Sequence, residues 1–271
     1  MTDNDARKRR TTSRGISVEM KTKSLILIGA LTATICICGR QAVKAGNPPN
    51  SADAAASTAT VKGKIKYEGK LPKSAAISMA ADPSCSKQHT SPVANQEVVA
   101  DAEGELQNVI VFIADGLGDR TFDPPTQPAV IEQKGCIYQP HVLGVRANQP
   151  FEVINDDPTS HNIHVIPTNN REWNKAEPPG TKIDEAFARE EIAIPVRCNI
   201  HPWMRSYVAV FKHPYFTVTG KDGSFDLSNL PPGTYTIEAW HEILGTATQK
   251  ITVGTNETKA VDFVFKQRPG M

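Results

Sequence analysis

The chain has 271 residues and a nearly neutral charge, with 30 Lys and Arg against 29 Asp and Glu and a formal net charge of +1. A chain without a basic surplus lacks the electrostatic footprint of a nucleic-acid-binding protein, so no nucleic-acid partner is expected.

Residues 1–45 are typical of a secretory signal peptide. Lys21 and Lys23 precede an apolar run that ends at Cys38, and the small residue Ala45 offers a cleavage position. The run is shorter than the ~20 residues of a spanning helix, so we expect no membrane span in the mature chain. The sequence therefore predicts a periplasmic or secreted protein with a cleaved signal, and an uncleaved anchor is the alternative.

The next segments predict a linker followed by short strands. Residues 46–58 are rich in Asn, Pro, Ser and Ala, which is typical of a flexible linker. Residues 61–67 then alternate with period two, residues 108–113 predict a buried strand, and Asp-Gly or Pro-Gly turns recur further on. No long amphipathic helix period occurs. The predicted fold class is therefore all-β, built from sandwich domains.

The segment 196–205 carries the most distinctive chemistry, because it holds Cys198, His201 and Met204 at three-residue intervals. A thiolate, two imidazoles and a weak axial thioether form the donor set of an electron-transfer copper site. The second imidazole is offered upstream by His161 or His164. Residues three apart in a strand point to opposite faces, so only one of these two can face the metal.

This loop resembles that of the cupredoxins, in their amicyanin- and plastocyanin-like branch, and residues 138–155 are similar to the strands that precede the first copper-binding histidine. The resemblance implies a Greek-key β-sandwich over residues 117–212. It implies one type 1 copper ion bound by His161, Cys198, His201 and Met204. It further implies that Asn162 forms a hydrogen bond to the Cys198 loop and so fixes the geometry of the site.

The C-terminal stretch, residues 213–271, shows a second signature. Residues 217–227 have the pattern of a hairpin closed by Asp222-Gly223, and a Pro-Pro-Gly turn then leads into an alternating strand that ends at Trp240. This pattern resembles the carboxypeptidase regulatory-like domain, a small transthyretin-like sandwich.

In that family, strands similar to residues 61–67 and 109–113 precede the hairpin, but here they also precede the copper region. We therefore expect the cupredoxin sandwich to be inserted into a discontinuous regulatory-like sandwich formed by 59–116 and 213–266. An insertion at a surface loop costs little when its ends lie close together. Two sequential domains with a separate N-terminal β region are the alternative.

Two further cysteines, Cys85 and Cys136, lie outside the signal and the copper loop. In an oxidising compartment a disulfide is the default for such a pair. A zinc site is the alternative, because His89 follows Cys85 by four residues and His141 follows Cys136 by five.

The predicted function is one-electron transfer by cycling of Cu(II) and Cu(I) with a redox protein partner, which would contact the His201 edge beside Pro202 and Trp203. No enzymatic activity is expected, because four ligands leave no position for a substrate and the sequence lacks the paired His-x-His motifs of multicopper oxidases. The alternatives are an envelope copper-binding or delivery protein and a surface-binding module, since a regulatory-like fold does not determine a function.

Overall fold

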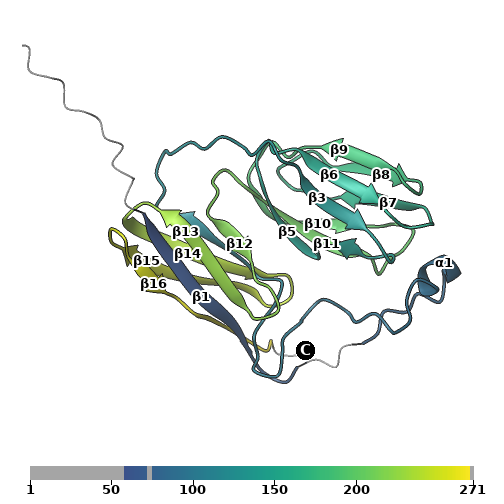
Figure 1. Ribbon diagram of the computed structural model, residues 1–271, viewed down its shortest axis with the longest axis horizontal. Helices are drawn as coiled ribbons and strands as arrows, with labels where there is room; N and C mark the ends of the chain where they lie inside the picture. The colour runs from purple at the N-terminus through teal and green to yellow at the C-terminus, as the bar shows by residue number, and fades with distance from the viewer. Residues whose placement is uncertain (1–57, 72–74, 269–271) are drawn as a thin grey trace, which may run out of the picture. The chain divides into compact units, whose positions relative to one another are not determined.

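The computed structural model describes residues 58–71 and 75–268, in which strands form nearly all of the regular secondary structure (Figure 1). The predicted signal, 1–45, and all but the last residue of the predicted linker, 46–58, lie outside the described residues. Within the described ranges there is one short helix, α1 (Pro83–Ser86), and no helix is long and apolar enough to cross a membrane. The predicted all-β fold class is confirmed.

The first sandwich consists of two sheets. One has the strand order β13-β1-β16, with β17 also paired to β1, and the other has the order β12-β2-β14-β15. The strands are β1 (Ala59–Glu68), β2 (Ile110–Asp115), β12 (Phe216–Val218), β13 (Ser224–Leu230), β14 (Gly233–His241), β15 (Gly245–Val253), β16 (Thr258–Ala260) and β17 (Phe263–Lys266). Side chains of both sheets, including Val61, Val111 and Ile237, share one buried core.

The pairing of β1 and β2 bears on the domain organisation. β1 lies antiparallel to β13 and parallel to β16 and β17, and β2 lies antiparallel to β12 and β14. Both N-terminal strands thus complete sheets whose other strands come from the C-terminal part of the chain. We propose on this basis that the two parts form one discontinuous domain, into which the second sandwich is inserted.

The second sandwich has a five-stranded sheet of order β5-β11-β10-β7-β8 and a four-stranded sheet of order β4-β3-β6-β9. Its strands are β3 (Ala129–Gln133), β4 (Tyr138–Gln139), β5 (Val142–Arg146), β6 (Phe151–Asn155), β7 (His161–Val165), β8 (Trp173–Glu177), β9 (Lys182–Glu185), β10 (Glu191–Arg197) and β11 (Arg205–Phe211). Ile131 and Val153 from one sheet pack with Ile163 and Val196 from the other in a second core.

β2 is buried on both of its faces. Val111 and Ile113 belong to the core of the first sandwich, whereas Ile110 and Phe112 pack with Phe211 of β11 in a third cluster. A strand that is covered on both faces carries a continuous apolar run instead of an alternating one. This explains why the buried strand was recognisable in the sequence.

The segment between β1 and β2 differs from the expectation that all of 59–116 belongs to the first sandwich. Met79 and Cys85 are part of the second core, and Ile77 and Val93 pack against it. Only the residues near the end of the segment, such as the fully buried Leu106, return to the first core. The apolar side chains of the segment explain the difference, because they bury their surface against the sandwich that follows in the sequence.

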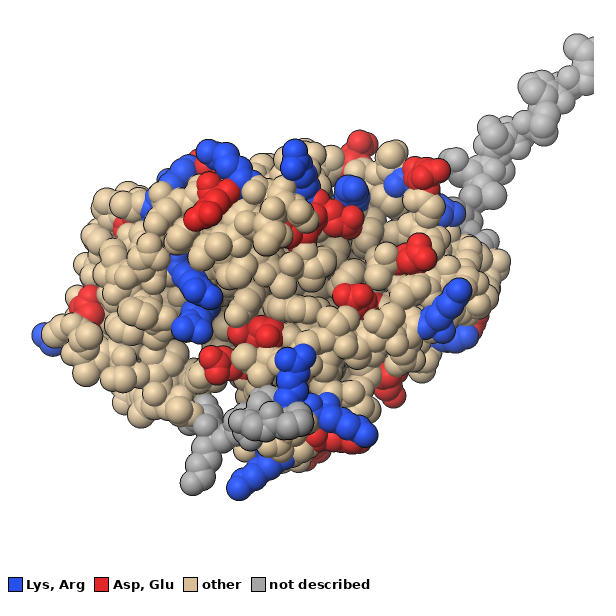
Figure 2. All heavy atoms as spheres, turned by 180° about the vertical axis from the view of Figure 1, so that it is seen from behind, with Lys and Arg blue, Asp and Glu red and all other residues tan. Residues whose placement is uncertain are grey.

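The charged side chains are mixed on the face shown in Figure 2, where acidic and basic residues are interspersed and neither sign gathers into one patch. Interspersed charges of this kind produce no strong single-sign field.

Candidate metal centre

The loop that joins β10 to β11 brings three predicted ligands together. The N–H of Cys198 donates to the carbonyl of Met204 at 3.2 Å, and the N–H of Met204 donates to the carbonyl of His201 at 2.9 Å. These hydrogen bonds fold the loop back on itself, and Pro202 restricts the backbone within it. As a result the side chains of Cys198, His201 and Met204 are all buried.

The fourth predicted ligand comes from the neighbouring strand β7. Arg197 of β10 pairs with His164 in antiparallel register, so the residues after Arg197 lie beside the start of β7. Alternation along the strand buries His161 completely and turns His164 outward, where its Nε2 lies 2.8 Å from Oε1 of Glu172. The structure thus brings His161, and not His164, to the Cys198 loop.

The inner nitrogens of the two histidines face each other. Nδ1 of His161 lies 2.9 Å from Nδ1 of His201, and Sγ of Cys198 lies 3.9 Å from the same His201 nitrogen. The donor atoms of His161, Cys198 and His201 all lie within 4.8 Å of one another. Two ring nitrogens that both presented lone pairs at this distance would repel each other, so the arrangement requires a cation or a proton between them.

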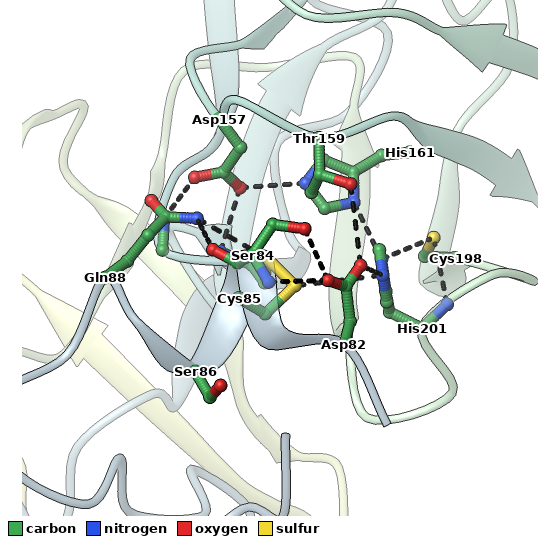
Figure 3. The surroundings of a disulfide bond; sticks show 12 residues. Asp82, Ser84, Cys85, Ser86, Gln88, Asp157, Thr159, His161, Cys198 and His201 are labelled. Atoms are coloured by element: carbon green, nitrogen blue, oxygen red, sulfur yellow. Dashed lines mark hydrogen bonds and ion pairs between the residues drawn. A yellow bond between two sulfur atoms is a disulfide. The ribbon is translucent and has the colours of Figure 1, made fainter. Parts of the chain in front are cut away.

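A carboxylate holds the outer nitrogen of each histidine (Figure 3). Nε2 of His161 lies 2.8 Å from Oδ2 of Asp157, and Nε2 of His201 lies 3.0 Å from Oδ2 of Asp82. A carboxylate only accepts, so each Nε2 carries the hydrogen and donates it. This assignment leaves Nδ1 of each ring as the metal-binding nitrogen, in the way that carboxylates orient the histidines of metal sites.

The hydrogen bonds of the cluster favour the charged forms of His161 and Cys198, although both side chains are buried. Burial opposes protonation of His161, but the hydrogen bond to Asp157 and the nearby Cys198 outweigh it and raise the pKa of His161 to about 9. Burial also opposes ionisation of Cys198, but hydrogen bonds from His161 and from backbone N–H groups lower the pKa of the thiol. These contacts favour the protonated form of His161, and a bound metal cation would compete with that proton.

Met204 lies in the same core as Cys198 and is fully buried. Its thioether is a soft, weak donor, which suits the axial role that the sequence predicts.

Asn162 forms the predicted link between β7 and the loop. Its Oδ1 accepts the N–H of Asn199 at 2.7 Å and the N–H of Ile200 at 3.4 Å, and it lies 3.4 Å from Sγ of Cys198. Its Nδ2 donates to Oδ1 of Asn174 at 2.8 Å. The amide is thus fixed on both sides and holds the loop in place.

The structure departs from the expectation of an accessible His201 edge. The segment around α1 lies over the ring, with Asp82 at Nε2 and Sγ of Cys85 3.7 Å from the same nitrogen, and His201 is only 2% exposed. Asp82 followed by Pro83 is a typical start of a helix, with a side-chain cap and proline in the first turn. This local signal could have located α1 in the sequence, but it contains nothing about what the helix covers.

A disulfide joins Cys85 to Cys136, as the sequence favoured, and it removes both sulfurs from metal binding. The histidines of the zinc alternative have other partners. His89 donates from Nε2 to a backbone carbonyl at 2.7 Å, and His141 pairs with Glu242 of the first sandwich. The zinc alternative is therefore wrong for the oxidised protein.

A family model for the carboxypeptidase regulatory-like domain matches residues 206–266. This range contains β12 to β17, so the predicted resemblance of the C-terminal strands is confirmed. The matched range is less than half of the chain, and it does not include β1 or β2. No curated protein sequence matches the chain.

Several solved structures are similar to part of the chain. A purple cupredoxin from Nitrosopumilus maritimus is 24% identical, with 31% of this chain and 99% of that chain covered and a TM-score of 0.27. A reduced amicyanin variant is 19% identical, with coverages of 37% and 98% and a TM-score of 0.29. A copper-containing nitrite reductase from Thermus scotoductus is 19% identical with a TM-score of 0.31, and the match covers 36% of this chain and only 25% of the reductase.

Proposed function

We propose that this protein binds one copper ion at His161, Cys198, His201 and Met204 and transfers single electrons to and from a redox protein partner. The proposal rests on one observation. Nδ1 of His161, Nδ1 of His201 and the sulfur of Cys198 lie close together in a buried cluster, and Nε2 of each histidine is hydrogen-bonded to a carboxylate. Bound copper would supply a one-electron redox centre by cycling between Cu(II) and Cu(I).

The residues around the cluster fit copper better than a harder cation. Cys198 and Met204 are soft sulfur donors, which select copper over magnesium or calcium. The two nearest carboxylates, Asp82 and Asp157, lie at the outer nitrogens of the histidines and not among the inner donor atoms. Hard cations prefer oxygen ligands, so this orientation disfavours them.

The protein matrix supports electron transfer by holding its donors in place. The loop hydrogen bonds, the Asn162 amide and the two carboxylates fix the side chains before any metal arrives. Burial excludes water from the cluster. Donors that keep one arrangement in both oxidation states need little reorganisation when an electron arrives or leaves.

We also propose a periplasmic or secreted location, with cleavage after the predicted signal. The Cys85–Cys136 disulfide supports this, because such bonds persist in oxidising compartments.

A second candidate function is copper retention or delivery without an electron partner. It is favoured by the cover over His201, because a buried imidazole edge gives a redox protein less access to the centre. Measuring how fast a small redox protein reduces the Cu(II) form distinguishes the two functions. Slow reduction by proteins combined with rapid reduction by a small reagent would favour retention.

The test of the proposal is the visible spectrum of the mature chain after addition of Cu(II). We expect an intense blue band from thiolate-to-copper charge transfer, which Cys198→Ser should abolish. His161→Ala should abolish it as well, while the matched variant His164→Ala should keep it. A colourless wild-type protein that binds no copper would refute the proposal, and loss of colour only in His164→Ala would reassign the ligand.

A further inference from the structure

We propose that Asp82 is a positioning residue for the metal centre, and that residues 79–90 form a closed cap over His201 that the Cys85–Cys136 disulfide holds shut. The inference rests on the proposed copper site. It adds a function for a segment that lies outside the sequence motif of that site.

The Asp82 carboxylate is fixed from both sides (Figure 3). Its Oδ1 accepts the N–H of Ser84 at 2.7 Å, and its Oδ2 accepts Nε2–H of His201 at 3.0 Å and the hydroxyl of Thr159 at 3.5 Å. A carboxylate bound in this way cannot rotate freely. It therefore sets both the tautomer and the ring orientation of His201.

Each half of the disulfide lies next to one of the two histidine–carboxylate pairs. Cys85 belongs to α1, whose N-cap is Asp82, the partner of His201. Cys136 donates its N–H at 2.8 Å to Oδ2 of Asp157, the partner of His161. The disulfide thus ties the helix that carries Asp82 to the residue whose N–H holds the Asp157 carboxylate.

Trp203 encloses His201 from another side. Its ring centroid lies 5.0 Å from that of His201, and its Nε1 donates to the carbonyl of Cys136 at 3.0 Å. The His201 ring is therefore surrounded by Asp82, the disulfide and the indole, which accounts for its exposure of only 2%.

The disulfide is the one covalent link between the cap and the sandwich beneath it in the described residues. α1 has four residues, which is too short for a helix to be stable by itself. Apart from the disulfide, the cap contacts the second sandwich through the buried Met79, the Asp82–His201 pair and a hydrogen bond from His89 to the carbonyl of Gly135. Without the disulfide we expect the cap to open by local unfolding while the sandwich beneath it stays folded.

The first test uses the metal-free mature chain and the double variant Cys85→Ala/Cys136→Ala. Acylation of histidines by diethyl pyrocarbonate, followed by peptide mass mapping, measures the access to each ring. We expect His201 to react about tenfold faster in the variant, because the cap opens more often. His161, buried beneath the loop, should stay protected, and the surface His164 should react equally in both proteins.

The second test measures copper loss from the loaded protein to an excess of chelator. Asp82→Ala, which keeps the disulfide, should lose copper about 10- to 100-fold faster than wild type and show an altered blue band. The matched control is Glu172→Ala, which removes the carboxylate partner of His164, the outward-facing histidine of β7. The control should behave as wild type.

The outcomes separate the inference from the proposed function. Equal His201 acylation in the wild type and the double variant would refute the cap, and copper loss from Asp82→Ala at the wild-type rate would refute the positioning role. A wild-type chain that binds no copper would refute the proposed function together with the positioning role. Faster acylation of His201 in the double variant would support the cap even then.

Discussion

Replacement of Asn162 by alanine tests whether this amide holds the copper loop. The variant loses a short hydrogen bond from the N–H of Asn199 and longer contacts to Ile200 and Cys198. A net hydrogen bond contributes about 1 kcal/mol, and the longer contacts contribute less. Because Asn199 and Ile200 are exposed, water can satisfy their N–H groups in the variant. We therefore expect a destabilisation of about 1–2 kcal/mol.

Urea denaturation of the metal-free protein measures this loss, and the visible spectrum of the copper form shows whether the Cys198 sulfur has moved. Asn174→Ala is the matched control, because it removes only the partner of the Asn162 Nδ2. The control should cost less than about 0.5 kcal/mol and leave the blue band unchanged. An equal loss of stability in Asn162→Ala and Asn174→Ala, or an unchanged spectrum in Asn162→Ala, would refute the role assigned to Asn162.

Three further predictions concern the axial ligand, the pH dependence and the domain organisation. Met204→Leu should keep copper but raise the reduction potential in a redox titration, because the thioether helps to stabilise Cu(II); a lowered or unchanged potential would exclude Met204 as a ligand. Burial lowers the pKa of His213 and of His241 to about 4, and Arg146 adds to the effect at His213. In the unfolded chain each histidine has its usual pKa of about 6.5, so it binds a proton there at a higher pH than in the folded protein. Each histidine should therefore lower the free energy of unfolding by about 2 kcal/mol at pH 5. His241→Asn should remove about half of this loss of stability when urea denaturation is compared above pH 6.5 and at pH 5. A pH dependence equal to that of the wild type would contradict the assignment. A fragment of residues 213–271 should be unfolded, because it lacks β1 and β2 and exposes open sheet edges; dispersed amide signals in its NMR spectrum would end the insertion hypothesis.

The sequence alone determined the features that depend on neighbouring residues. The spacing of Cys198, His201 and Met204 places them in one loop, where short-range hydrogen bonds close the turn. Strand alternation is equally local, and it separates the buried His161 from the outward His164. The apolar run of β2 and the turns of the C-terminal hairpins are likewise local patterns, so the all-β fold could be predicted from them.

Only the tertiary structure decided what covers the site. The contact between Asp82 and His201 spans 119 residues, and the contact between Cys85 and His201 spans 116. Contacts across such distances leave no periodicity or spacing in the sequence, because they depend on how two separately formed segments pack. Packing against the second core carries Cys85 and its helix over the metal centre, and the accessible His201 edge that local reasoning predicted is lost for that reason.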